Sequence, residues 1–152
     1  MICETQSTTL PSGIPRPKSL TVTAPPASAD KAPAADQTLT LADFSFELSA
    51  PVKAGARTIR VVNKGGQAHE VVIVKLATGA SAADFAETLR PGVAFPPAGK
   101  PIGGLSGLDP GGEGFVRLDF QPGRYGLICF LPDLVTRGPH FARGMLLDID
   151  VR

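Results

Sequence analysis

Residues 115–130 read FVRLDFQPGRYGLICF, and this stretch predicts two short strands joined by a turn. Apolar and polar side chains alternate over residues 115–120, which is the period of a half-buried β-strand. Residues 121–123, Gln-Pro-Gly, are typical of a turn. In the strand that follows, Cys129 is in phase with Leu127 and shares its face. The stretch therefore predicts a β protein in which a cysteine ends one strand.

The rest of the chain contains more strand patterns. Residues 39–48 alternate, but the phase reverses at Ala42-Asp43, which predicts a bulge or a bend that lets one strand serve two sheets. Residues 58–63 are predicted as a second strand. Residues 69–76 are predicted as a third, with an apolar run typical of a central strand. The last strand is predicted at residues 145–151.

One helix and one long loop complete the pattern. Ser81 followed by Asp84 predicts the N-cap of a short helix, which Pro91-Gly92 would end. From there to Gly114 the sequence is dominated by Gly and Pro, which predicts a long structured loop with few backbone hydrogen bonds. Short strands, frequent turns and one minor helix indicate an all-β fold, a Greek-key antiparallel β-sandwich.

Composition divides the chain and excludes some partners. Residues 1–36 are rich in Pro, Ala, Ser and Thr without apolar periodicity, so they are predicted to be a flexible tail or linker before a folded domain at 37–152. The net charge of +1, with no basic stripe, argues against a nucleic-acid partner. The chain contains no run of about eighteen apolar residues, so no transmembrane segment is predicted. No secretory signal is visible at the start of the chain.

The chain contains only two histidines, and both lie where a metal site would need them. Cys129, His140 and Met145 flank one loop between two predicted neighbouring strands, so their side chains can converge at one end of a sandwich. His69 begins a strand after another loop and can reach the same end. A thiol, two imidazoles and a thioether are the donor set that copper takes in a mononuclear site. The four residues together therefore predict metal binding.

Each of these residues also has a simpler interpretation. His69 is in phase with apolar residues of its strand, so it can be a core histidine that is hydrogen-bonded to a backbone carbonyl. Cys129 and Met145 can be plain core packing. His140 follows a proline in a loop and can be exposed.

Four phrases carry a resemblance to a known family. They are Asp43-Phe-Ser-Phe46, Asn63-Lys-Gly-Gly-Gln-Ala-His69, Phe120-Gln-Pro-Gly-Arg-Tyr125 and Gly138-Pro-His140-Phe-Ala-Arg-Gly-Met145. From Leu39 to Val151 the chain resembles the cupredoxins, the blue copper proteins, and is most similar to bacterial cupredoxin-domain proteins. The resemblance implies one copper ion, cycling between Cu(I) and Cu(II), bound by His69, Cys129, His140 and Met145. It also implies that Asn63 and Glu70 brace the site by hydrogen bonds.

The resemblance further implies how such a protein would meet its partner. His140 would be the ligand nearest the surface and the port for the electron. An apolar docking patch would surround it, formed by Phe130, Leu131, Pro139 and Phe141. The implied partner is a redox protein, bound weakly and transiently by a monomer. The implied location is periplasmic or otherwise extracytoplasmic.

One feature departs from the family pattern. Ten residues separate Cys129 from His140, where well-known blue copper proteins have a shorter loop. The long loop predicts more motion and more solvent at the metal, which would suit the carriage of copper better than electron transfer.

Three functions therefore stay open. The first is a one-electron carrier, the second is a copper chaperone or storage module, and the third is a metal-free sandwich that serves as an interaction module. An enzyme is not expected, because both histidines are committed to copper and neither is left as a general base.

Overall fold

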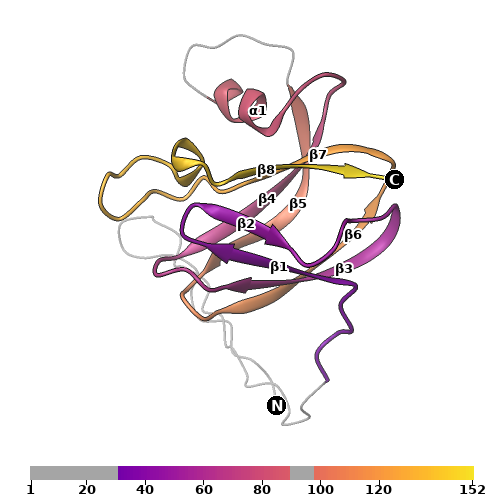
Figure 1. Ribbon diagram of the computed structural model, residues 1–152, viewed down its shortest axis with the longest axis horizontal. Coiled ribbons are helices and arrows are strands. Elements are labelled where there is room, and N and C mark those ends of the chain that lie inside the picture. Colours follow the sequence, from indigo (N-terminus) through magenta and orange to yellow (C-terminus); the bar gives the residue numbers. More distant parts are fainter. Residues whose placement is uncertain (1–30, 90–97) are drawn as a thin grey trace, which may run out of the picture. The chain divides into compact units, whose positions relative to one another are not determined.

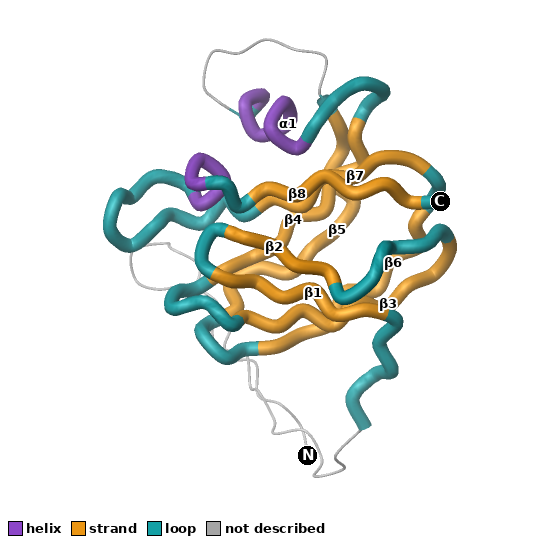
Figure 2. Tube along the Cα trace, in the orientation of Figure 1, coloured by secondary structure: helices purple, strands orange, loops and turns teal. Residues whose placement is uncertain are grey.

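The computed structural model describes residues 31–89 and 98–152 of the chain. Strands dominate this part, as Figure 2 shows. They are β1 (Gln37–Ala42), β2 (Ser45–Leu48), β3 (Gly55–Asn63), β4 (His69–Leu76), β5 (Gly99–Leu108), β6 (Glu113–Phe120), β7 (Gly123–Ile128) and β8 (Leu146–Val151). The helices are α1 (Ala82–Thr88) and the 3₁₀ turn η1 (His140–Arg143). Most of the predicted tail, residues 1–36, lies outside the described residues.

The strands form two four-stranded sheets (Figure 1). The first has the order β2-β1-β3-β6 and the second has the order β5-β4-β7-β8. β1 pairs in parallel with β3, with Leu41 opposite Asn63, while the other strand pairs are antiparallel. The predicted sandwich of two sheets is confirmed.

The core lies between the sheets because each strand turns alternate side chains inward. Its buried apolar members come from both sheets and include Leu39, Leu41, Ile59, Val61, Val71, Ile73, Tyr125 and Leu127. Cys129 and Met145 belong to the same buried cluster. The predicted inward phase of Cys129 is therefore confirmed, and the cysteine is held in the interior by the strand that precedes it.

α1 covers the outer face of the second sheet. Ser81 and Asp84 form a reciprocal capping box at its start, as the sequence predicts. Phe85 packs with Val74 and Ile128, so β4 is buried on both faces, as its continuous apolar run indicates. Within the described residues, no helix combines the length and the apolar character needed to cross a membrane.

The prediction of one bent strand over residues 39–48 is wrong. Residues 37–48 form a tight hairpin, β1 and β2, with Asp43 and Phe44 at its turn. Leu41 lies opposite Phe46, so both point into the core although they are five residues apart. The phase reversal in the sequence is thus the signature of a two-residue turn rather than of a bulge. Phe44 has a φ of 65°, a conformation that few non-glycine residues adopt.

The prediction of a long loop before Gly114 is also wrong, because β5 pairs with β4 there. β5 is an edge strand, and edge strands tolerate glycine and proline better than central ones. Gly104 makes the pairing feasible, since a Cβ there would lie 2.1 Å from the carbonyl oxygen of Val71. The predicted helix stop at Pro91-Gly92 lies outside the described residues.

The topology brings three chain segments together at one end of the second sheet. β7 is antiparallel to both β4 and β8, so the end of β7 lies beside the starts of β4 and β8. His69 starts β4, Cys129 follows β7, and Met145 precedes β8. Sheet pairing therefore gathers three of the predicted ligands before any metal binds.

Candidate metal centre

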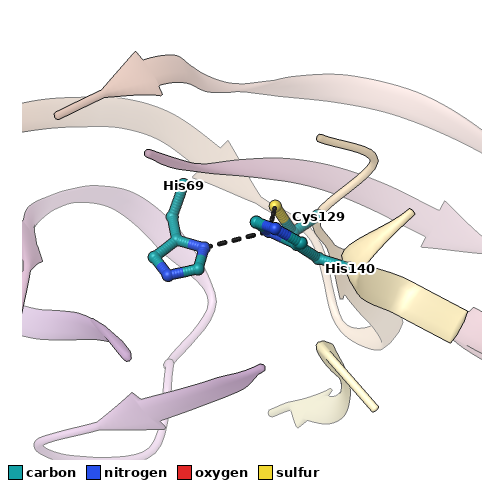
Figure 3. Close-up of side chains that lie close together, drawn as sticks. All are labelled: His69, Cys129 and His140. Atoms are coloured by element: carbon teal, nitrogen blue, oxygen red, sulfur yellow. Dashed lines mark hydrogen bonds between the residues drawn. The ribbon is translucent and has the colours of Figure 1, made fainter. Parts of the chain in front are cut away.

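The side chains of His69, Cys129 and His140 converge in the interior (Figure 3). Nδ1 of His69 lies 3.1 Å from Nδ1 of His140, and Sγ of Cys129 lies 3.3 Å from the same His140 nitrogen. The three potential ligand atoms all lie within 4.8 Å of one another. All three side chains are fully buried. One ion could therefore contact all three atoms without exposure to solvent.

The outer nitrogens of both imidazoles are occupied by acceptors. Nε2 of His69 lies 2.8 Å from Oδ1 of Asp43, and Nε2 of His140 lies 3.2 Å from Oε1 of Gln67. A carboxylate oxygen and an amide oxygen only accept, so each neutral imidazole carries its proton on Nε2. Both Nδ1 atoms then present lone pairs to each other at 3.1 Å. Two facing lone pairs repel each other unless a cation lies between them, so the geometry of the two rings suits a bound metal ion.

The sulfur of Cys129 sits in an environment that suits a metal-bound thiolate. Burial raises the pKa of the Cys129 thiol, and backbone hydrogen bonds from Glu70 and Leu131 oppose this rise. A metal that binds the sulfur therefore displaces a proton from it. Soft sulfur beside two imidazole nitrogens matches the preference of copper, so the donor set fits this metal.

Met145 is fixed next to Cys129 by the backbone. The amide of Cys129 donates to the carbonyl oxygen of Met145 at 3.2 Å, and the amide of Met145 donates to the carbonyl oxygen of His140 at 3.1 Å. The Met145 side chain is fully buried in the core cluster that contains Cys129. The backbone therefore brings the thioether residue to the cysteine and the histidine that flank the loop.

Glu70 and Asn63 both make hydrogen bonds around the site. Oε1 of Glu70 accepts from the amide of Phe130 at 3.0 Å, which ties the residue after His69 to the residue after Cys129. Nδ2 of Asn63 donates to the carbonyl oxygens of Gln67 and Leu108, both at 2.8 Å. Asn63 therefore organises the loop that carries Gln67 and leads into β4.

Asp133 makes several hydrogen bonds within and beside the loop between Cys129 and His140, while the greater motion that the loop's length predicts stays a prediction. The buried Asp133 carboxylate accepts from the Val135 amide, the Thr136 hydroxyl and the Arg143 guanidinium. These bonds, that of Val135 foremost, hold the Asp133 pKa far below its usual range. The backbone closes the base of the loop with a hydrogen bond from the His140 amide to Leu131 at 2.8 Å. The loop therefore combines a buried, hydrogen-bonded carboxylate at Asp133 with exposed residues at 134–137.

The simpler interpretation of His140, an exposed histidine in a loop, is contradicted. Its ring is fully buried, with Gln67 over Nε2 and the Phe44 ring edge-on at a centroid distance of 5.4 Å. Arg143 stacks over the same Phe44 ring at 4.0 Å and also bonds Asp133. The side chains over this ring therefore come from the β1–β2 turn and from the loop before β4. The ligand loop contributes indirectly, because the amide of Leu134 donates to Gln67.

The residues expected to form a docking patch are each only partly exposed. Phe130 and Phe141 contact each other edge-on at 5.4 Å and pack against the cluster under α1. Leu131 packs against the main core. The exposed apolar side chains of the loop are instead Leu134, at 64%, and Val135, at 85%.

Sequence reasoning missed three residues that shape the site. Asp43 appears only within a phrase that resembles the family, Gln67 lies two residues before His69, and Asp133 lies in the ligand loop. A carboxylate at a hairpin turn is a weak signal, because Asp is common in turns for local reasons. Only the distance between Asp43 and His69 in space reveals what the residue does.

The chain is similar to several solved structures. The reduced auracyanin from Roseiflexus castenholzii is similar at 23% identity, with a TM-score of 0.52, over 76% of this chain and 94% of that chain. Auracyanin A, a "blue" copper protein from Chloroflexus aurantiacus, matches at 22% identity and a TM-score of 0.48, over 76% and 99% of the chains. Rusticyanin from Thiobacillus ferrooxidans matches at 17% identity and a TM-score of 0.46, over 76% of each chain.

The likeness to the Roseiflexus auracyanin confirms the cupredoxin fold that the sequence predicts. No protein-family model and no curated protein sequence matches the chain. The fold is therefore shown by structure, while the activity must be argued from the site itself.

Gly65 supplies a steric test of the His69–Asp43 contact. A Cβ at this position would lie 2.5 Å from both Nε2 of His69 and Oδ1 of Asp43. Gly65→Ala must therefore push the pair apart, and we expect about 10–100-fold weaker Cu(I) binding. Competition with a chromophoric chelator measures the affinity. Gly138→Ala is the matched control, since its Cβ meets only Oγ1 of Thr136, at 3.7 Å. Equal affinities in the two variants would contradict the expectation.

The burial of His140 predicts how the stability of the metal-free protein depends on pH. Burial, aided by nearby His69, lowers the His140 pKa below its ordinary value of 6.5. As the pH falls through 6.5, the unfolded chain takes up a proton that the folded chain does not. The free energy of unfolding should then fall by at most about 1.4 kcal/mol per pH unit from this group.

Urea unfolding of the metal-free protein at several pH values between neutrality and 5 measures this slope. His140→Gln should flatten it, because the titrating group is gone. Asp43 and Asp133 affect stability only at lower pH, because their pKa values lie below the ordinary 3.8. Their contribution to the free energy of unfolding is lost only under more acidic conditions. A wild-type stability that stays constant down to pH 5 would refute the expectation for His140.

Proposed function

We propose that this protein is a one-electron carrier with one copper ion bound by His69, Cys129 and His140, and with Met145 as a weak axial ligand. The single observation that carries the proposal is the convergence of two Nδ1 atoms and one buried sulfur, with both Nε2 atoms already committed to acceptors. Bound copper would supply the redox chemistry by alternating between Cu(I) and Cu(II). The protein supplies donors that are acceptable to both states.

The stiffness of the site supports electron transfer over the delivery of copper. A centre that changes little between two oxidation states loses little energy to rearrangement when the electron moves. Here sheet pairing holds His69 and Cys129, while the ordered loop holds His140. A chaperone, in contrast, has to present its metal to the recipient, and all three ligand side chains are fully buried. The buried ligands therefore favour a carrier of electrons.

A copper titration of the reduced full chain, followed by oxidation and voltammetry, tests the proposal. We expect one equivalent of copper, an intense thiolate-to-copper absorption in the visible range after oxidation, and a reversible one-electron wave. Tight Cu(I) binding without a reversible wave would instead indicate a copper chaperone or storage module. No binding in either state would leave a sandwich whose four suggestive residues only pack. The location outside the cytoplasm, which the resemblance implies, is tested separately by fractionation of the native cells.

A further inference from the structure

We infer that electrons leave this centre through Gln67 and the exposed tip of the ligand loop, Leu134 and Val135, rather than through an exposed histidine edge. The inference rests on the proposed function, since it needs a copper ion that cycles. It starts from the complete burial of His140, which leaves no ligand ring at the surface to meet a partner.

A continuous bonded route connects the buried ligand to the tip. Oε1 of Gln67 lies 3.2 Å from Nε2 of His140 and also accepts from the backbone amide of Leu134 at 3.2 Å. Electronic coupling passes better through covalent and hydrogen bonds than across a gap. The route therefore runs from the copper-facing ring, through one amide group, to the backbone of the loop tip.

The tip is exposed, and its backbone is hydrogen-bonded to the rest of the protein. Leu134 and Val135 are 64% and 85% exposed, and the remaining large apolar side chain exposed in the described part of the chain is Leu89, at the end of α1. The amide of Val135 donates to the buried carboxylate of Asp133, which anchors the backbone of the tip. An exposed apolar tip at the end of the bonded route can meet a partner directly.

The small size of this tip indicates what kind of partner binds it. Two side chains supply a small part of the roughly 800 Å² per partner that a stable interface buries, so the contact must be brief. Brief contacts of this kind are characteristic of electron-transfer pairs. The partner that binds the tip is therefore a redox protein with a small apolar surface over its own metal. A second copy of this chain meets that description and makes the reaction measurable.

The step is a simple exchange of one electron. The Cu(I) centre of one molecule is oxidised to Cu(II), while the Cu(II) centre of the other molecule is reduced to Cu(I). No bond forms or breaks, and no proton moves. The rate of electron self-exchange between the Cu(I) and Cu(II) forms therefore reports on the electron route through the tip directly. The amounts of the two forms stay the same throughout the reaction.

Self-exchange of the copper-loaded full chain, measured by NMR line broadening, tests the inference. Leu134→Asp and Val135→Asp should each slow the exchange by roughly 10–100-fold, because two tips of like charge repel each other and lose their apolar contact. The visible spectrum should stay unchanged. Leu89→Asp is the matched control, an exposed leucine in another element, and should exchange at the wild-type rate.

Gln67 is tested by a pair of variants. Gln67→Leu removes the bridging oxygen and should slow the exchange, measured on protein loaded with one equivalent of copper. Gln67→Glu retains an acceptor for both N–H groups, so it should recover most of the rate, with a lower reduction potential from the added charge. Tip variants that exchange as fast as Leu89→Asp would overturn the inference and leave the proposed function standing. A wild-type protein that binds copper but does not cycle would overturn both.

Discussion

Cys129→Ser is expected to abolish the intense visible absorption of the oxidised copper protein completely. This absorption requires a thiolate bonded to Cu(II), and a serine hydroxyl is a poor ligand for copper at neutral pH. The folded chain should survive the change, because serine is similar in size and its hydroxyl can reach Nδ1 of His140, which lies 3.3 Å from the sulfur in the native protein. Absorption spectra of both proteins at one equivalent of copper measure the effect.

The chain offers a matched control in its other cysteine. Cys3→Ser removes a thiol from residues 1–36 and should leave the visible absorption unchanged, since the site is formed by described residues of the sandwich. Thermal unfolding of metal-free Cys129→Ser checks that the loss of colour is not a loss of fold. Retention of the absorption in Cys129→Ser, or its loss in Cys3→Ser, would show that Cys129 is not the copper ligand.

The second large effect is expected from Asp43→Ala, with copper binding weaker by about 10–100-fold. Oδ1 of Asp43 lies 2.8 Å from Nε2 of His69 and holds the proton there, which leaves Nδ1 free for the metal. The hydrogen bond to His69 is also the main reason why the Asp43 pKa is lowered, so the carboxylate is charged at neutral pH. Without it, the imidazole can rotate or take its other tautomer.

Two further variants separate orientation from charge. Asp43→Asn keeps an oxygen that can accept from His69, so it should retain most of the affinity but raise the reduction potential, because a negative charge that stabilises Cu(II) is lost. Asp119→Ala removes an exposed carboxylate from β6 and should change neither quantity. Affinity from chelator competition and potential from voltammetry distinguish these cases. An Asp43→Ala protein with wild-type affinity would show that the carboxylate does not position the ligand.

The ordered ligand loop links these predictions to function. Asp133 holds the loop through the amide of Val135, the hydroxyl of Thr136 and the guanidinium of Arg143. The amide of Leu134, in the same loop, donates to Gln67, which lies over Nε2 of the buried His140. A long ligand loop can therefore support a buried metal site through its hydrogen bonds.

The sequence alone determined the sandwich and the identity of its candidate ligands. Alternation of apolar residues over β6 and β7, the capping box at Ser81 and the apolar run of β4 are local patterns, which depend on a few neighbouring residues. The ligand set was equally accessible, because only two histidines exist to be chosen. Where the local pattern was ambiguous, as in the hairpin turn at Asp43-Phe44 and the glycine-rich β5, the sequence-based prediction failed.

Only the tertiary structure decided how the ligands are held and enclosed. Asp43 reaches His69 across 26 positions of the chain, and Gln67 reaches His140 across 73. The first contact joins a turn of one sheet to a strand of the other, and the second joins the loop before β4 to the start of η1. No local periodicity encodes such contacts, since they depend on the packing of two sheets and on the path of one loop. Burial of the centre follows from that packing, and with it the route by which an electron can leave.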